Sequence, residues 1–199
     1  MSPTGPPTEA GGPSRRPCES VVLCEGYDDR AFWKGWLCHL RCTDALESSG
    51  GPLVLDPWNR RVSGGQYAFY SASGSFIRVV PCKGKEQVLR QTRTRLDERN
   101  TRDLVHLVVN LDADEDASSD RDHTATLRQR VIGLLDSRQS PYEPDHGGNL
   151  LLDDGATMVS TVCWHASDPP DPELPDKQTL ERLVCSAIIS AYPERGPAH

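Results

Sequence analysis

Two short acidic motifs carry the residue types best suited to chemistry in this chain. They are Glu25-Gly-Tyr-Asp-Asp29 and Asp112-Ala-Asp-Glu-Asp116. Hard cations such as Mg²⁺ bind carboxylate oxygens, and waters and a substrate phosphate usually complete the coordination. Asp112 and Asp114 alternate along an extended segment, so their side chains share a face and could bind one ion. The motifs therefore predict a site for a divalent cation.

A basic tripeptide, Lys83-Gly-Lys85, supplies the complementary charge. The longer stretch 83–102 is rich in Lys and Arg and could line a local basic groove. A solvated helix face explains most of these side chains equally well.

Composition restricts the class of protein. The chain has 199 residues, a formal net charge of −7 and a pI near 5.3, which argues against a protein that coats nucleic acid through a basic surface. No run of about 18–20 apolar residues and no signal-peptide pattern occur, so we expect a cytoplasmic protein that does not bind membranes. Seven cysteines without a CxxC pair suit a reducing compartment.

The pattern along the chain predicts the elements that position these motifs. Residues 1–17 are rich in Pro, Gly and Ser and predict a disordered tail, and residues 18–199 predict one domain with a loop or hairpin insertion around 43–75. Hydrophobic periodicity predicts strands at 20–24, 66–70, 75–80, 104–111, 150–152 and 157–164, and helices at 28–40, 86–96, 124–135 and 178–191.

Strands alternate with helices in this prediction, which favours an α/β fold with a mostly parallel sheet and right-handed crossovers. Both acidic motifs directly follow apolar strands. Because the carboxyl ends of parallel strands open onto one edge of a sheet, where ligands bind, the two motifs should meet there.

The order strand-Glu-Gly-x-x-Asp followed by strand-Asp-x-Asp resembles the signature of Toprim domains. The stand-alone Toprim proteins of uncharacterised function, related to the Toprim domains of OLD-type nucleases, look most similar. Weaker matches are Lys83-Gly-Lys85, Asp168 and Thr179-Leu-Glu181. The resemblance implies a Rossmann-like, mostly parallel sheet flanked by helices.

The resemblance also implies the roles of the acidic residues. Glu25 would act as general acid or base, and Asp112 and Asp114 would hold Mg²⁺ or Mn²⁺ as part of the catalytic site. Asp116 joins Glu25, Asp112 and Asp114 among the candidate metal ligands, although it also fits a helix N-cap position. The implied activity is metal-dependent phosphodiester cleavage or phosphoryl transfer on DNA or RNA, with an ATPase or other protein as a further partner.

Other residues would support this site. Lys83 and Lys85 would bind the substrate phosphate, and the supporting residues are Gly26, Asp28, Asp29 and Glu181. Glu181 could equally be an exposed helix residue.

Two alternatives remain open. The fold could be a non-catalytic module that binds a nucleotide or a protein partner, or an enzyme acting on a small nucleotide, which the acidic pI favours. The histidines show no metal-binding spacing, and His106 lies in an apolar strand as a core residue would. Trp33, Trp36 and Trp164 are predicted core residues, and Trp58 or Tyr67 could stack on a base.

Overall fold

The computed structural model describes residues 17–46, 54–113, 122–165 and 174–192. These residues form a single eight-stranded sheet with the strand order β2-β3-β4-β1-β5-β8-β7-β6. The strands are β1 (Glu19–Cys24), β2 (Thr43–Asp44), β3 (Tyr67–Tyr70), β4 (Phe76–Pro81), β5 (Leu104–Asp112), β6 (Tyr142–Pro144), β7 (Leu150–Leu152) and β8 (Met158–Trp164). The helices are α1 (Tyr27–His39), α3 (Lys85–Glu98), α4 (His123–Asp136) and α5 (Leu180–Ala191), with a short 3-10 turn, Arg99–Thr101.

The sheet is mixed, so the expectation of a mostly parallel Rossmann-like sheet is wrong. Three pairings, β1–β4, β1–β5 and β5–β8, are parallel. Four pairings, β2–β3, β3–β4, β6–β7 and β7–β8, are antiparallel. The parallel strands form the centre, and short antiparallel strands extend the sheet on both sides. Short connections rather than helical crossovers join β3 to β4, β6 to β7 and β7 to β8.

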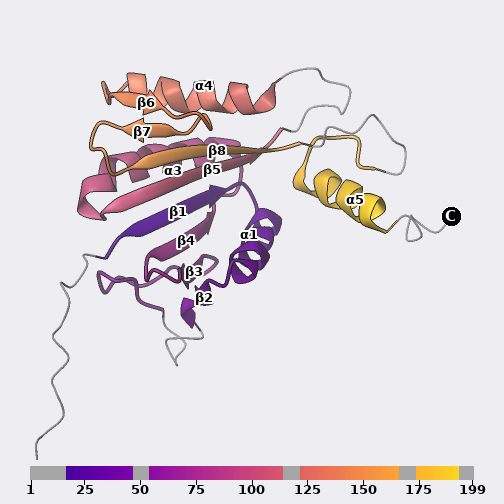
Figure 1. Cartoon of the computed structure of the whole chain (residues 1–199), viewed down its shortest axis with the longest axis horizontal. Coiled ribbons are helices and arrows are strands. Elements are labelled where there is room, and N and C mark those ends of the chain that lie inside the picture. Colours follow the sequence, from indigo (N-terminus) through magenta and orange to yellow (C-terminus); the bar gives the residue numbers. More distant parts are fainter. Residues whose placement is uncertain (1–16, 47–53, 114–121, 166–173, 193–199) are drawn as a thin grey trace, which may run out of the picture.

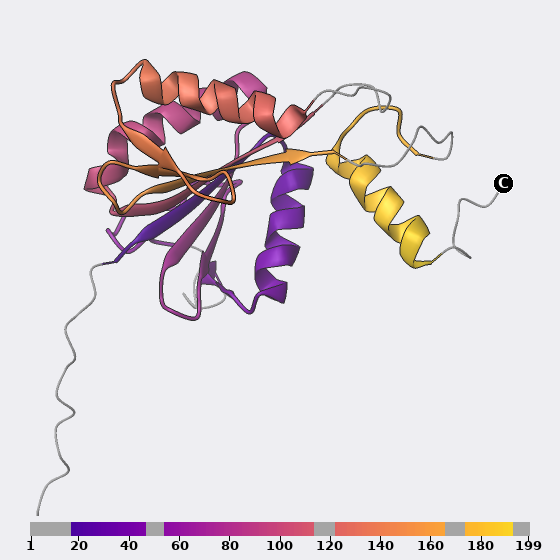
Figure 2. The same cartoon turned by 45° about the horizontal axis from the view of Figure 1, so that its top comes forward.

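Alternate residues of the central strands face two separate cores. In β1, Val21 and Leu23 join the cluster that contains residues of α3 and α4, whereas Val22 and Cys24 join the cluster that contains Leu37 of α1. Helices α3 and α4 therefore cover one face of the sheet and α1 covers part of the other, as Figures 1 and 2 show. A strand that is buried on both faces has a nearly continuous apolar sequence, and the sequences of β1 and β5 fit this description.

The predicted helices and strands lie close to those observed, and the largest differences are at their ends. The helix predicted at 86–96 runs from 85 to 98, and the one predicted at 178–191 begins at Leu180. Local caps fix these boundaries: the Asp122 carboxylate accepts a hydrogen bond from Ala125 N at 2.8 Å at the start of α4, and Thr179 caps α5.

The prediction that Trp36 is a core residue is wrong, because 48% of its surface is exposed. Trp36 lies on the outer side of α1, where its ring stacks on Phe32 with centroids 6.3 Å apart. Trp164 is buried, and Trp33 is partly buried with its Nε1 donating to Asn110 Oδ1 at 2.7 Å.

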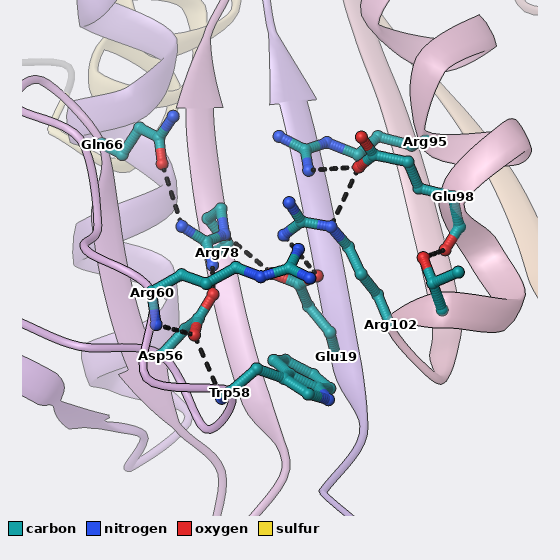
Figure 3. Close-up of polar contacts among 10 residues, drawn as sticks. Glu19, Asp56, Trp58, Arg60, Gln66, Arg78, Arg95, Glu98 and Arg102 are labelled. Carbon is teal, nitrogen blue, oxygen red and sulfur yellow. Dashed lines mark hydrogen bonds and ion pairs between the residues drawn. The ribbon is translucent and has the colours of Figure 1, made fainter.

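A buried ion cluster lies at the opposite edge of the sheet from the acidic motifs. Arg78 of β4 donates from Nε to Glu19 Oε1 at 2.7 Å and from an Nη to Asp56 Oδ2 at 2.9 Å (Figure 3). Arg102 adds a contact to Glu19 at 3.6 Å and another to Glu98 at 2.9 Å. Arg102, at the end of the predicted basic groove, therefore has a structural ion-pairing role.

Several predicted features lie outside the described residues. These include nearly all of the predicted tail at 1–17, and also Asp114, Glu115, Asp116 and Asp168. In the part of the chain that is described, no helix is both long enough and apolar enough to span a membrane.

Candidate functional site

The two acidic motifs lie at the carboxyl ends of neighbouring strands. Glu25 follows β1 directly, and Asp112 is the last residue of β5, which pairs in parallel with β1. Asp112 is partly buried and Glu25 is likewise half-buried. The parallel pairing thus brings the two carboxylates, 87 positions apart by number, to one edge of the sheet.

Asp29 organises the turn that follows β1. Its Oδ2 accepts a hydrogen bond from Gly26 N at 2.7 Å, and its Oδ1 accepts one from Trp164 Nε1 at 2.8 Å. Burial raises the pKa of Asp29, and the two hydrogen bonds partly oppose that effect. Asp29 therefore links the start of α1 to the end of β8. Asp28, beside it, is exposed in the first turn of α1.

The pKa of Asp112 is strongly shifted by its surroundings. Burial and the negative charge of Asp29 raise the pKa of Asp112 to about 7, with smaller contributions from Glu25 and Glu181. A hydrogen bond from Leu180 N to Asp112 Oδ1, at 3.0 Å, acts in the opposite direction. Three carboxylates, those of Asp29, Glu25 and Glu181, are therefore close enough to influence the protonation of Asp112, which is an electrostatic pattern found at many functional sites.

Helix α5 brings Glu181 to this edge. Its first residue, Leu180, donates its backbone N–H to Asp112, so the positive end of the helix dipole points at that carboxylate. Glu181 follows in the first turn and is exposed. Sequence alone left Glu181 undecided, and the structure places its charge near Asp112 and Asp29.

The basic tripeptide folds back onto the first acidic motif. The backbone N–H groups of Lys83 and Gly84 both donate to Glu25 O, at 2.9 and 3.1 Å. Lys83 and Gly84 have positive φ angles of 64° and 112°, which make the turn sharp. Lys83 is exposed, whereas Lys85 begins α3 and its Nζ donates to Ala113 O at 3.4 Å. Of the two lysines, Lys85 is the one that reaches the end of β5.

A small pocket of about 90 Å³ opens beside Asp112. Its lining comes from the ends of β5 and β8 and from α3 and α4: Lys85, Leu111, Asp112, Ala113, His123, Thr126, Leu127, Arg130 and Cys163. The sequence prediction missed His123 and Arg130. Their spacing of seven residues places them on one face of a helix, two turns apart, which is the signal that could have identified them.

The described residues supply only part of a metal site. Among residues 17–46, 54–113, 122–165 and 174–192, no group of three or more His, Cys, Asp or Glu side chains is arranged to hold a metal ion. Carboxylate oxygens are nevertheless the donors that Mg²⁺ and Mn²⁺ prefer. Asp114 and Asp116, the other two predicted ligands, lie outside these ranges.

His106 shows the features of a core histidine. Its Nε2 and Ser160 Oγ are hydrogen-bonded at 2.8 Å, and Ser160 also donates to Asn149 Oδ1 at 2.7 Å. Burial lowers the pKa of His106, so the imidazole is neutral at pH 7. It lies toward the middle of the sheet, away from the acidic edge.

The fold and site together define an α/β protein with a mixed sheet and a carboxylate-rich edge. No protein-family model matches the chain, and no curated protein matches it. The crystal structure of a hypothetical protein from Pyrococcus horikoshii OT3 is similar, with a TM-score of 0.60 and 16% sequence identity over 88% of this chain and 70% of that one. At this identity the similarity concerns the fold alone.

A glyoxalase/dioxygenase from Nostoc punctiforme also aligns, with 13% identity over 84% of this chain and 100% of that one. Its TM-score of 0.23 is too low to indicate a common fold.

Proposed function

We propose that this chain carries out metal-dependent phosphodiester cleavage or phosphoryl transfer on nucleic acid, as the resemblance of its acidic motifs to the Toprim signature implies. The observation that supports this most is that the parallel pairing of β1 and β5 brings Glu25 and Asp112 to one edge of the sheet, near Asp29 and Glu181. Burial and these neighbouring charges raise the pKa of Asp112 to about 7. Clustered negative charge costs folding free energy, and a bound divalent cation would offset that cost. Such an arrangement is more easily explained by a cation site than by packing.

Asp112 would hold the cation together with Glu25 and with Asp114 and Asp116. Bound there, Mg²⁺ or Mn²⁺ would neutralise charge that develops on the phosphoryl oxygens. Glu25, half-buried at the same edge, would accept or donate the proton of the attacking or leaving hydroxyl. Lys85, at the end of β5, would attract the substrate phosphate.

A second candidate, a non-catalytic nucleotide- or partner-binding module, also has a specific observation in its favour. Both carboxylate oxygens of Asp29 accept internal hydrogen bonds, and Asp112 Oδ1 caps α5. Two of the four carboxylates therefore also have structural roles, which a binding module would share with an enzyme.

A cleavage assay separates the two candidates. Labelled single- and double-stranded DNA and RNA are incubated with the protein and with Mg²⁺, Mn²⁺ or EDTA. We expect metal-dependent cleavage of at least one polymer, lost in Glu25→Gln and Asp112→Asn. Asp136→Asn is the matched control, because Asp136 is an exposed aspartate at the far end of α4. Absence of cleavage on every substrate would favour the binding module.

Metal binding is measured separately by calorimetric titration with Mn²⁺. If Glu25 mainly moves a proton, Glu25→Gln should retain most of the affinity, whereas Asp112→Asn should lose it. Equal affinity in wild type and Asp112→Asn would contradict the metal assignment.

We also infer that the protein works in a reducing compartment such as the cytoplasm. All seven cysteines lie in described residues and are free thiols. Burial raises the pKa of Cys82 to about 11, so this thiol stays protonated and unreactive at neutral pH.

A further inference from the structure

The pocket beside Asp112 has both apolar and basic lining residues. Leu111, Leu127 and Cys163 contribute to its apolar lining. Lys85 from α3 and His123 and Arg130 from α4 line it as well. Its volume of about 90 Å³ is well below the roughly 300–1,000 Å³ of pockets that enclose whole small molecules. The space therefore suits one small anionic group rather than a nucleoside.

Two of these basic side chains retain unused hydrogen-bonding capacity toward the described residues. Arg130 is exposed and makes no ion pair or side-chain hydrogen bond with any residue in the described ranges. The Nε2 of His123 is buried and has no hydrogen-bond partner there either. A buried polar atom without a partner costs folding free energy, and a bound ligand that hydrogen-bonds to it would recover that free energy.

We propose that this pocket binds a terminal phosphate of the substrate, that is, a phosphomonoester, and that Arg130, His123 and Lys85 recognise it. The inference rests on the proposed function, because it places the phosphate end next to the carboxylates that would act on the adjoining phosphodiester. A monoester fits better than an internal diester because it carries up to two negative charges against these basic groups, whereas an internal diester carries one.

The presence of Asp112 in the pocket wall makes phosphate binding depend on the cation. A phosphate beside this carboxylate is repelled unless positive charge lies between them. A divalent ion held by Asp112 would remove the repulsion, so each ligand should tighten the binding of the other by the same factor. Lys85 and Arg130 supply the positive charge that acts when the ion is absent.

Titration with inorganic phosphate tests the pocket without any need for turnover. Binding is followed by calorimetry for wild type, Arg130→Gln, His123→Gln and the control Arg93→Gln, which changes an exposed arginine of α3. We expect Arg130→Gln to weaken phosphate binding at least tenfold, His123→Gln to weaken it less, and Arg93→Gln to leave it unchanged. Equal phosphate affinity in wild type and Arg130→Gln, with both proteins folded by circular dichroism, would overturn the assignment.

Competition between ligands then identifies the source of the phosphate. Short oligonucleotides with a 5′-phosphate, a 3′-phosphate or hydroxyl ends only, and adenosine monophosphate, are compared at equal concentration. We expect a phosphorylated oligonucleotide to bind more tightly than its hydroxyl-ended counterpart, and this difference to vanish in Arg130→Gln. Stronger binding of the free mononucleotide would support the pocket and identify a nucleotide as ligand. Equal binding of phosphorylated and hydroxyl-ended ligands would contradict the proposal.

These results can be distinguished from failure of the proposed function. If phosphate binding depends on Arg130 but no polymer is cleaved, the phosphate-binding assignment is supported and only the catalytic assignment is contradicted. If cleavage depends on Asp112 but not on Arg130 or on the terminal phosphate, the proposed function is supported and the phosphate-binding assignment is contradicted.

Discussion

The indole Nε1 of Trp164 donates a hydrogen bond to Asp29 Oδ1 at 2.8 Å, and both residues are buried. This bond joins the last residue of β8 to the first turn of α1. Since Asp29 also accepts from Gly26 N, the turn that carries Glu25 is held from two sides. The geometry of the acidic edge therefore depends on a tryptophan that no functional motif contains.

Replacing Trp164 with Phe should destabilise the fold by about 1–3 kcal/mol, because the buried Asp29 carboxylate loses a donor while the ring contact with Phe32 is largely kept. Urea unfolding at pH 7 measures the change. Trp36→Phe is the control, since Trp36 is half exposed, and it should change stability by less than about 0.5 kcal/mol. Equal losses in the two variants would show that the hydrogen bond contributes little.

The pH dependence of stability should report the raised pKa of Asp112. An aspartate in an unfolded chain has a pKa near 3.9, whereas Asp112 in the fold titrates at about 7. Between these values Asp112 binds more protons in the folded state, so its contribution to stability falls as pH rises from about 4 and is fully lost once the pH is well above 7.

Asp112→Asn removes this penalty and keeps an oxygen that can accept from Leu180 N. In EDTA, the stability of the variant relative to wild type should therefore increase by about 2–4 kcal/mol between pH 4.5 and 8. Urea unfolding across this range gives the difference directly. A difference that stays constant with pH would mean that the pKa of Asp112 is not raised.

Saturating Mg²⁺ should reverse the effect at pH 8 if the cation binds Asp112. A ligand present at 100 times its dissociation constant stabilises the folded state by about 2.7 kcal/mol. We expect the melting temperature of wild type to rise with Mg²⁺ and to return to its initial value with EDTA, while Asp112→Asn should show no rise. Asp136→Asn, which removes an exposed carboxylate at the far end of α4, should behave as wild type.

Any side chain at Gly84 should destabilise the fold, although an added Cβ atom would meet no atom within 4 Å apart from its chain neighbours. Its φ of 112° is one that L residues rarely adopt, so Gly84→Ala should cost about 1–3 kcal/mol. The strain should also shift Lys85, the next residue, and weaken phosphate binding in the titration described above. Gly133→Ala is a matched control in α4, where nothing crowds an added methyl group, and it should stabilise by about 0.5–1 kcal/mol.

The sequence predicted the central part of this fold because the hydrophobic pattern of each segment there indicates its secondary structure. The apolar runs of β1 and β5 indicate buried strands, and the spacing of apolar residues in α4 indicates a helix. The mixed character of the sheet was missed for two reasons. Strands β2 and β6 are two and three residues long, too short to show a period, and the antiparallel pairing of β7, a strand that was predicted, depends on tertiary contacts.

The candidate site was predictable only where its residues follow strands. Glu25 and Asp112 follow or end apolar runs, so their shared edge follows from the parallel pairing of the two strands. The contribution of Trp164 and Arg130 could not be predicted in this way. Their positions depend on tertiary contacts, namely the contact of Trp164 in β8 with α1 and the position of Arg130 in α4 near the end of β5. The pattern within a single segment of sequence does not predict such contacts.

The buried ion cluster should make Arg78 one of the most sensitive positions of the fold. Removing its guanidinium by Arg78→Met leaves the carboxylates of Glu19 and Asp56 buried beside an uncharged side chain. Breaking one side of a buried ion pair costs about 3–5 kcal/mol, so we expect a loss of that size. Lys34→Met breaks a longer pair, at 3.8 Å, between the half-exposed Lys34 and Asp44, and should cost less than about 1 kcal/mol.

A double variant shows whether the loss comes from the unpaired charges or from missing packing. Adding Glu19→Gln to Arg78→Met removes one uncompensated carboxylate, so the double variant should be more stable than Arg78→Met alone. Urea unfolding of the single and double variants gives the coupling free energy. If Glu19→Gln destabilised Arg78→Met further, the arginine would act mainly through its packing against Phe76, whose ring centroid lies 5.2 Å from its guanidinium carbon.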